Sequence, residues 1–340
     1  MLNNKNYNKE INIWLTGLIL LVGLIIIVGG LTRLTNSGLS IIEWELFEGI
    51  LPPLTNEKWI TYFKSYQTIP QYEILNKNMT LSEFKVIFLW EYYHRLLARF
   101  IGLFFLIPFL FFTYKNIFQK NYNRKFILVF FLILLQGVVG WYMVKSGLVN
   151  DVSVSHYRLS IHLSTAFIII STIFWLIKNI IKKTNKNFFN FKSDYLPFLI
   201  LIFLIFIQIV LGAFVSGLDA GRIYQTWPLM GYTYFPNDII VENLNNIINF
   251  SNHSLVQFYH RNLAYLITLY ILILSFYIYK KKITYLHNPV KLVLLFLLLQ
   301  IILGIFTLVS GLNIYLASAH QISSVLLVFS ALNLYYLRVK

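Results

Sequence analysis

The sequence predicts an all-α integral membrane protein. Its eight transmembrane helices are expected to form two four-helix bundles related by a pseudo-two-fold axis along the membrane normal. Three observations support this fold class: the composition is too apolar for a soluble protein, eight apolar runs are long enough to cross a bilayer, and one four-helix unit occurs twice along the chain.

The composition sets the class of protein. Hydrophobic residues make up 58% of the 340 residues, charged residues only 12%, and the mean hydropathy is +0.67, whereas a soluble domain carries about 25% charged residues. The net charge of +15 therefore indicates basic cytoplasmic loops rather than a nucleic-acid partner. The chain has no cysteine, which excludes disulfides, thiolate metal sites, iron–sulfur clusters and thioether-bound haem. No cleavable leader is evident in the short polar start, so the first apolar run is expected to remain as a span.

Crossing a bilayer core takes roughly 20 apolar residues. Runs of this kind occur in order at 12–32, 86–113, 126–145, 157–178, 195–217, 254–279, 290–311 and 315–337. Short basic segments separate the second run from the third, the fourth from the fifth, and the sixth from the seventh. The two long connections, 33–85 and 218–253, are rich in Asn, Thr, Tyr and Pro and contain no convincing apolar run.

The charges of the connections predict the orientation. Lys and Arg dominate the segments 1–11, 114–125, 179–194 and 280–289 and the C-terminal tail, whereas the long connections carry mixed or acidic charge. The positive-inside rule therefore places both termini in the cytoplasm and the long connections outside. The short start and the Ile, Asn and Lys bias favour a bacterial inner membrane over a mitochondrial one.

An internal repeat divides the chain. Residues 91–98 recur at 257–264, 136–140 at 300–304, and 160–164 at 318–322, while 36–38 with Trp44 match 219–221 with Trp227. The repeat predicts an N-terminal half at 1–190 and a C-terminal half at 191–340. Because each half has an even number of spans, both point the same way across the membrane.

Four histidines recur with the repeat: His94, His162, His260 and His320. Each lies five to eight residues inside a span that enters from the outer side, at a depth of roughly 8–13 Å. Polar residues at this depth usually face the interior of a bundle. A buried histidine satisfied by one hydrogen bond explains a lone case, but not four at equal depth.

Two histidines in each half predict a haem-sized site. Zinc requires three or four ligands, and each half offers only two repeated histidines. Bis-imidazole ligation of haem iron needs one histidine from each of two facing helices. We therefore pair His94 with His162, and His260 with His320. The other histidines, His156, His253 and His287, are interpreted as ordinary residues at the outer mouth, a helix entrance and a cytoplasmic loop.

Charged residues accompany both predicted sites. Guanidinium groups match the carboxylates of haem propionates, and we expect this role for five arginines: Arg33, Arg95, Arg158, Arg222 and Arg261. The alternative is that these long side chains only extend to the membrane interface. One difference separates the halves, because Glu91 in the first stands where the second has Gln257. Glu91 lies three residues before His94, on the same helix face. A carboxylate there can accept a proton or stabilise positive charge, which an amide cannot.

These motifs together resemble haem A synthases. They are Glu91-x-x-His94-Arg95, the 155–159 segment leading to His162, Gln257-x-x-His260-Arg261, and His320-Gln321, with the 29–40 and 225–230 segments in support. The resemblance covers nearly the whole chain. It points to the mitochondrial and alphaproteobacterial branch, which lacks an outer-loop cysteine pair. His156 departs from that branch, where Gln is expected.

The resemblance implies a reaction and its partners. The C8 methyl group of haem O would be oxidised to a formyl group at His94 and His162, giving haem A for cytochrome oxidase, with Glu91 as the catalytic carboxylate. His260 and His320 would hold haem b. Haem O synthase would supply the substrate, an electron-transfer partner of unknown identity would be required, and the fold allows a homo-oligomer.

Two other functions fit parts of the pattern. A non-catalytic di-haem b-type electron carrier would use the same four histidines, although such carriers commonly place haems near both membrane faces. A transporter built from parallel repeats would use His and Arg to bind an anionic solute.

Overall fold

The computed structural model describes residues 7–44, 48–240 and 247–339, so residues 1–6 and 340 of the basic termini lie outside the described residues. Eight helices within these ranges are long and apolar enough to cross a membrane. They are α1 (Asn8–Leu34), α4 (Leu81–Tyr114), α5 (Lys120–Asn150), α6 (His156–Ile181), α7 (Leu196–Gly217), α9 (His253–Lys280), α10 (His287–Val309) and α11 (Ile314–Arg338). The predicted all-helical, multi-pass membrane protein is confirmed.

The helices extend beyond the predicted apolar runs. α5 begins six residues before its run and α4 begins at Leu81 rather than 86. At the start of α4 the Thr80 side chain accepts from the Glu83 backbone, and the Glu83 side chain accepts from the Thr80 backbone. This capping box lets a helix begin in polar sequence, which hydropathy alone does not register.

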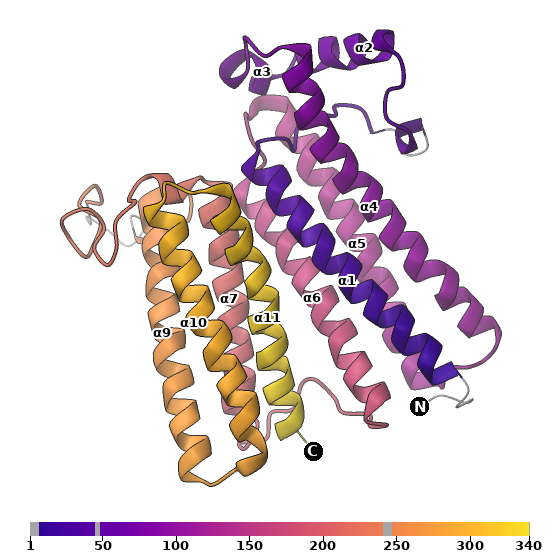
Figure 1. The fold of residues 1–340 in the computed structure, drawn as a ribbon, viewed down its shortest axis with the longest axis vertical. Helices are drawn as coiled ribbons and strands as arrows, with labels where there is room; N and C mark the ends of the chain where they lie inside the picture. The colour runs from indigo at the N-terminus through magenta and orange to yellow at the C-terminus, as the bar shows by residue number, and fades with distance from the viewer. Residues whose placement is uncertain (1–6, 45–47, 241–246, 340) are drawn as a thin grey trace.

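Figure 1 shows the long helices in two groups that lie side by side. One contains α1, α4, α5 and α6, and the other contains α7, α9, α10 and α11. The groups are joined where α6 packs against α7 and where α1 packs against α11. His94 and His162 lie on α4 and α6 of the first group, and His260 and His320 lie on α9 and α11 of the second.

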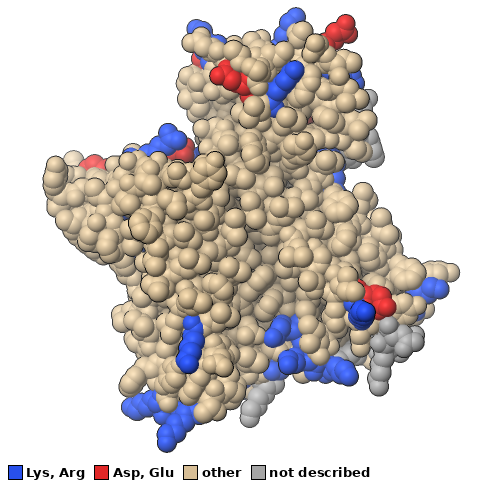
Figure 2. All heavy atoms as spheres, viewed as in Figure 1, with Lys and Arg blue, Asp and Glu red and all other residues tan. Residues whose placement is uncertain are grey.

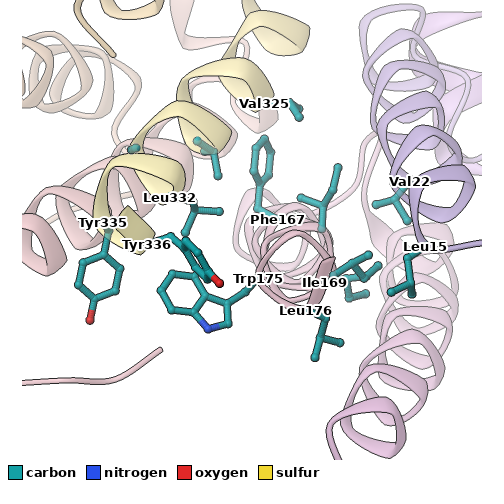
Figure 3. Close-up of a cluster of buried hydrophobic side chains, with 14 of the residues drawn as sticks. Leu15, Val22, Phe167, Ile169, Trp175, Leu176, Val325, Leu332, Tyr335 and Tyr336 are labelled. Carbon is teal, nitrogen blue, oxygen red and sulfur yellow. The ribbon is translucent and has the colours of Figure 1, made fainter. Parts of the chain in front are cut away.

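A shared apolar core joins the two groups (Figure 3). Trp175 of α6 packs against Tyr335 and Tyr336 of α11, with ring centroids 5.5 and 5.0 Å apart. Leu15 and Val22 of α1 belong to the same cluster. Lipid is as apolar as these side chains, so close packing rather than escape from water stabilises such contacts.

The first long connection contains structure that the sequence analysis did not predict. It forms η2 (Glu48–Ile50), α2 (Asn56–Tyr66) and α3 (Pro70–Leu75). α2 and α3 pack with the first turns of α4 around Tyr66 and Phe84. These helices are too short to span and carry mixed polarity, so hydropathy does not reveal them. In Figure 2 most of the visible Lys and Arg side chains gather at the end of the molecule opposite α2 and α3.

Candidate functional site

The structure brings His94 of α4 and His162 of α6 together. Their ring centroids lie 6.3 Å apart and their planes are nearly perpendicular, at 88°. A metal–imidazole bond is about 2 Å long and the ring centre lies about 1 Å farther, so two imidazoles on one iron would have centres about 6 Å apart. The spacing of this pair fits bis-imidazole ligation.

Each repeated histidine lies against a glycine of a neighbouring helix. A Cβ atom at Gly29 of α1 would lie 3.2 Å from the His94 ring, and one at Gly140 of α5 would lie 3.0 Å from the His162 ring. In the other group, a Cβ atom at Gly212 of α7 would lie 3.2 Å from the His260 ring, and one at Gly304 of α10 would lie 3.1 Å from the His320 ring. Any larger residue would displace the ring, so glycine makes space for the imidazole at all four places.

Glutamine side chains fix the helices that carry these histidines. Gln136 donates to the His162 carbonyl at 3.0 Å, and Gln300 donates to the His320 carbonyl at 2.8 Å. Gln208 of α7 donates to the His260 carbonyl at 3.0 Å and lies 3.2 Å from its Nδ1. Sequence reasoning missed Gln208, whose aligned residue in the first half, 183 positions earlier, is Ile25.

The ring nitrogens keep capacity for a metal. Within the described ranges, the buried Nδ1 atoms of His162 and His320 have no hydrogen-bond partner. A buried polar atom without a partner is costly unless something else binds there. No cluster of three or more His, Asp or Glu side chains that could hold a metal ion occurs in the described part of the chain. The His94–His162 pair, with its two imidazoles, fits a group that takes two axial ligands.

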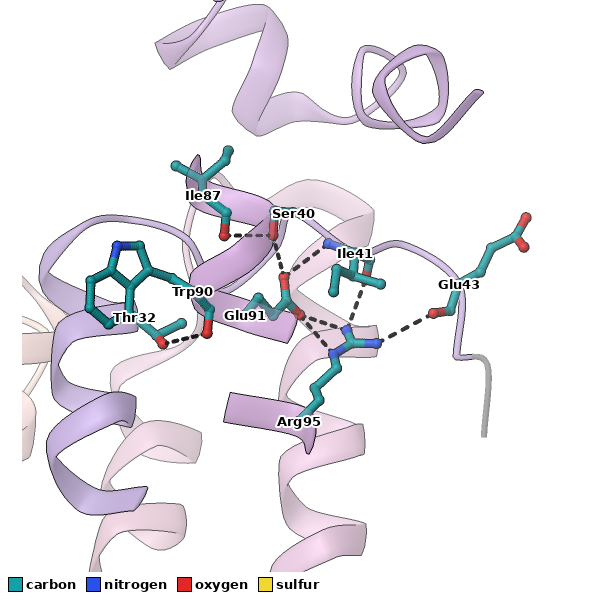
Figure 4. A network of polar contacts seen from close by, with 8 residues as sticks. All are labelled: Thr32, Ser40, Ile41, Glu43, Ile87, Trp90, Glu91 and Arg95. Atoms are coloured by element: carbon teal, nitrogen blue, oxygen red, sulfur yellow. Dashed lines mark hydrogen bonds and ion pairs between the residues drawn. The ribbon is translucent and has the colours of Figure 1, made fainter. Parts of the chain in front are cut away.

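Glu91 is buried in a network of donors (Figure 4). Its Oε2 accepts from Ser40 Oγ at 2.7 Å and from the Ile41 backbone at 2.9 Å. Its Oε1 accepts from Arg95 Nη2 at 2.6 Å and from Nε at 3.1 Å. Arg95 also donates to the carbonyls of Ile41 and Glu43. The carboxylate and guanidinium together hold the first outer connection against α4, one helical turn from His94.

The second half has the same arrangement without the carboxylate. Arg261 donates to the carbonyls of Tyr224 and Thr226, which align with those of Ile41 and Glu43 at the repeat offset of 183. Gln257 donates to the Tyr224 carbonyl at 2.8 Å. Both arginines therefore fasten an outer connection to the helix that carries a histidine, and only the first half adds a negative charge.

The other three arginines predicted to match propionates, Arg33, Arg158 and Arg222, lie near the helix ends that adjoin the long connections. Arg33 pairs with Asp219 at 2.9 Å across the two groups. Arg158 donates to Ser146 at 2.6 Å and lies 5.0 Å from the ring centroid of Tyr142, and Arg222 is exposed. Propionate binding by these side chains stays a prediction.

The other histidines lie outside the two imidazole pairs. His156 packs against Gly217 and Phe214, and His253 is exposed at the start of α9. His287 was expected in an open loop, but it begins α10 and packs on Tyr279 with centroids 4.3 Å apart. An apolar run does not show how far a helix extends into the polar residues before it.

Sequence reasoning did not single out the glycines that line the imidazoles. Gly140 and Gly304 recur within the repeated 136–140 and 300–304 segments, and Gly29 and Gly212 share the offset of 183. A comparison of the two halves for shared small residues would have found them.

Comparisons with known proteins agree with this arrangement. A family model described as cytochrome oxidase assembly protein matches residues 12–332. The chain is 51% identical to the haem A synthase of Pelagibacter ubique (strain HTCC1062) over 331 residues, which cover 96% of each chain. It is 42% identical to that of Ehrlichia ruminantium (strain Gardel) over 342 residues, covering 98% of this chain and 94% of the relative. It is 41% identical to that of Nitrosospira multiformis (strain ATCC 25196 / NCIMB 11849 / C 71) over 336 residues, covering 95% and 92%. With its paired imidazoles and full-length similarity, this chain belongs to the haem A synthase family.

Proposed function

We propose that this protein converts haem O to haem A by oxidising the C8 methyl group to a formyl group. The observation that carries the proposal is the His94–His162 pair, whose 6.3 Å centroid spacing fits a single iron. Glu91 lies on the same face of α4 as His94, one turn away. The identity to haem A synthases over nearly the full chain supports the same function.

The two halves would bind different haems. Residues 1–190 would bind the substrate haem O at His94 and His162, and residues 191–340 would bind haem b at His260 and His320. A pseudo-two-fold axis along the membrane normal would relate them. Support comes from the repeated histidine–glycine contacts and from the repeated fastening of an outer connection by Arg95 and Arg261.

Glu91 would act on the substrate through its charge. Forming the formyl group removes two hydrogen atoms from the methyl group and adds one oxygen atom. Positive charge that develops near the methyl carbon must therefore be stabilised, and protons must be accepted there. Both oxygens of Glu91 accept two hydrogen bonds each. A carboxylate held in this way can stabilise developing positive charge without breaking a contact. Gln257 cannot do this, so oxidation would be confined to the first half.

The second half would hold a permanent cofactor. When bound, haem b supplies one-electron redox chemistry. His260 and His320 would be its ligands, Gln208 orients His260 through its carbonyl and ring, and Gln300 fixes the helix that carries His320. Arg261 closes the outer connection over α9 and helps to exclude water.

The protein would lie in a bacterial inner membrane with both termini in the cytoplasm. More of the visible Lys and Arg side chains lie at the end opposite α2 and α3 than beside these helices (Figure 2), which supports this orientation. Haem O synthase would supply its substrate, and its product would serve cytochrome oxidase assembly. An electron-transfer partner is required, and a homo-oligomer is compatible with the exposed apolar helix faces.

The decisive experiment is co-expression with a haem O producer, followed by extraction and chromatographic identification of the haems. We expect haem A to appear and the purified protein to contain haem b. A protein that contains haem b alone and forms no haem A would overturn the proposal and favour an electron carrier. A protein without any Soret absorbance would indicate a transporter instead.

A further inference from the structure

A cavity of about 190 Å³ lies between the first long connection, α4 and α5. Its walls include Ile42 and Trp44 of the connection, Arg95 of α4, and Trp141, Lys145 and Leu148 of α5. We call this cavity the Lys145 pocket. Tryptophan and cationic side chains around an apolar cavity are typical of the membrane interface, where amphipathic molecules bind.

The two cations of the pocket differ in their availability. The Arg95 guanidinium is already paired with Glu91 and lies 5.2 Å from the Trp44 ring centroid. The Lys145 ammonium lies 5.2 Å from the Trp141 ring centroid, and no carboxylate forms an ion pair with it among the described residues. Lys145 is therefore the charge that an anionic ligand can meet.

The second half lacks this charge. The Ser-Gly-Leu sequence at 146–148 recurs at 310–312, so Lys145 aligns with Val309 and Trp141 with Ile305. Arg158 at the neighbouring helix start aligns with Leu316 by the same repeat that aligns His162 with His320. These two positions are thus cationic in the first half and apolar in the second.

Two residues that line the pocket directly follow residues of the first imidazole site in the sequence. Arg95 directly follows His94, and Trp141 directly follows Gly140, which contacts the His162 ring. Lys145 lies five residues beyond Gly140 toward the outer end of α5, about 7.5 Å along the helix axis. A ligand held between the imidazoles that extends this far along the axis of α5 would bring its polar edge level with the ammonium.

We propose that the Lys145 pocket binds a propionate carboxylate of the substrate haem and so distinguishes the exchangeable haem of the first half from the permanent haem of the second. The inference rests on the proposed function. The ammonium donates to the carboxylate, and Trp44 and Trp141 cover the apolar part of the ligand edge. A site that must repeatedly select and release its haem benefits from this polar contact, whereas Val309 in the other half offers none.

The test measures haem O binding by Soret titration of full-length protein in nanodiscs of neutral phosphatidylcholine, with free-acid haem O and its dimethyl ester as probes. We expect Lys145→Ala to weaken binding of the free acid about tenfold and to leave binding of the ester unchanged. Lys145→Arg should retain most of the affinity for the free acid. Lys77→Ala, which removes an exposed lysine from the same outer connection, serves as the matched control and should bind like the parent.

Two results would overturn the inference. One is equal affinity of the parent protein and Lys145→Ala for the free acid. The other is an effect of Lys145→Ala that appears only when anionic lipid is added and is the same for acid and ester, because the pocket would then hold a lipid headgroup. Failure of the parent protein to form haem A would instead contradict the proposed function, so the two failures are distinguishable.

Discussion

Arg33 of α1 and Asp219, just beyond the end of α7, form an ion pair of 2.9 Å that joins the two helix groups. The same guanidinium donates at 2.9 Å to Asn36, which aligns with Asp219 at the repeat offset of 183. Asn36 and Asp219 both have left-handed backbone conformations, with φ of 53° and 51°, just after a helix end. One arginine thus bridges equivalent turns of the two halves.

This bridge should couple the halves weakly. Asp219 is 46% exposed, so solvent screens the pair and its coupling energy should stay below about 1 kcal/mol. A double-mutant cycle of Arg33→Ala and Asp219→Ala, followed by thermal denaturation in detergent, measures that energy. We expect it to decrease further at high salt. A coupling of several kcal/mol would show that the pair is screened far less than its exposure indicates.

A second contact between the halves should matter more. A Cβ atom at Gly30 would lie 1.7 Å from Gln321 Oε1, and Gln321 donates to the Ile26 carbonyl at 3.1 Å. Gly30→Ala should displace Gln321 and lower the unfolding free energy by about 1–3 kcal/mol. Gly23→Ala is the matched control, because no atom lies within 4 Å of its Cβ and alanine favours the helix. Equal melting temperatures of the two variants would contradict the packing of α1 against α11.

Glu91→Gln should reduce haem A formation about a hundredfold or more, because an amide cannot supply the negative charge. Haem A and haem O are quantified by chromatography after co-expression with a haem O producer. The haem b content should stay near that of the parent, which separates loss of catalysis from loss of fold. Glu57→Gln, an exposed carboxylate on α2, is the control. Normal haem A formation by Glu91→Gln would disprove the assigned role.

The two imidazole pairs should bind different haems. His260→Ala should remove haem b from the purified protein, whereas His94→Ala should retain haem b and lose affinity for added haem O. The pyridine haemochrome spectrum identifies the bound haem, and a Soret titration measures the affinity. Loss of haem b from His94→Ala but not from His260→Ala would reverse the assignment of the halves.

The second outer connection should detach at low pH. Burial alone would raise the pKa of the Asp238 carboxyl. Hydrogen bonds from Ser254 and Tyr224 outweigh this effect and hold the pKa below its ordinary value of 3.8. A lowered pKa in the folded state means that this stabilisation is present above pH 3.8 and is lost as the pH falls through the folded value. Limited proteolysis across this range should show increased cleavage near residue 238. Asp238→Asn should remove that part of the pH dependence, and an unchanged profile would contradict it.

The spans and the repeated histidines could be predicted because they depend on local sequence. A bilayer requires about 20 apolar residues per helix, so the eight helices follow from hydropathy, and the repeat identified His94, His162, His260 and His320 without coordinates. α2 and α3 could not be predicted in the same way. Their positions depend on packing around Tyr66 and Phe84, residues separated in sequence.

The membrane class, the eight helices, the repeat and the charge difference between Glu91 and Gln257 follow from residue type and spacing alone. Which side chains contact one another depends on the packing of the helices. This packing directs Arg95 and Arg261 to the outer connections, places Gly29 and Gly140 against the imidazoles, and leaves Lys145 facing a cavity. Hydropathy specifies that a helix crosses the membrane but not its rotation about its own axis, and that rotation, set by packing between helices, selects which side chains meet.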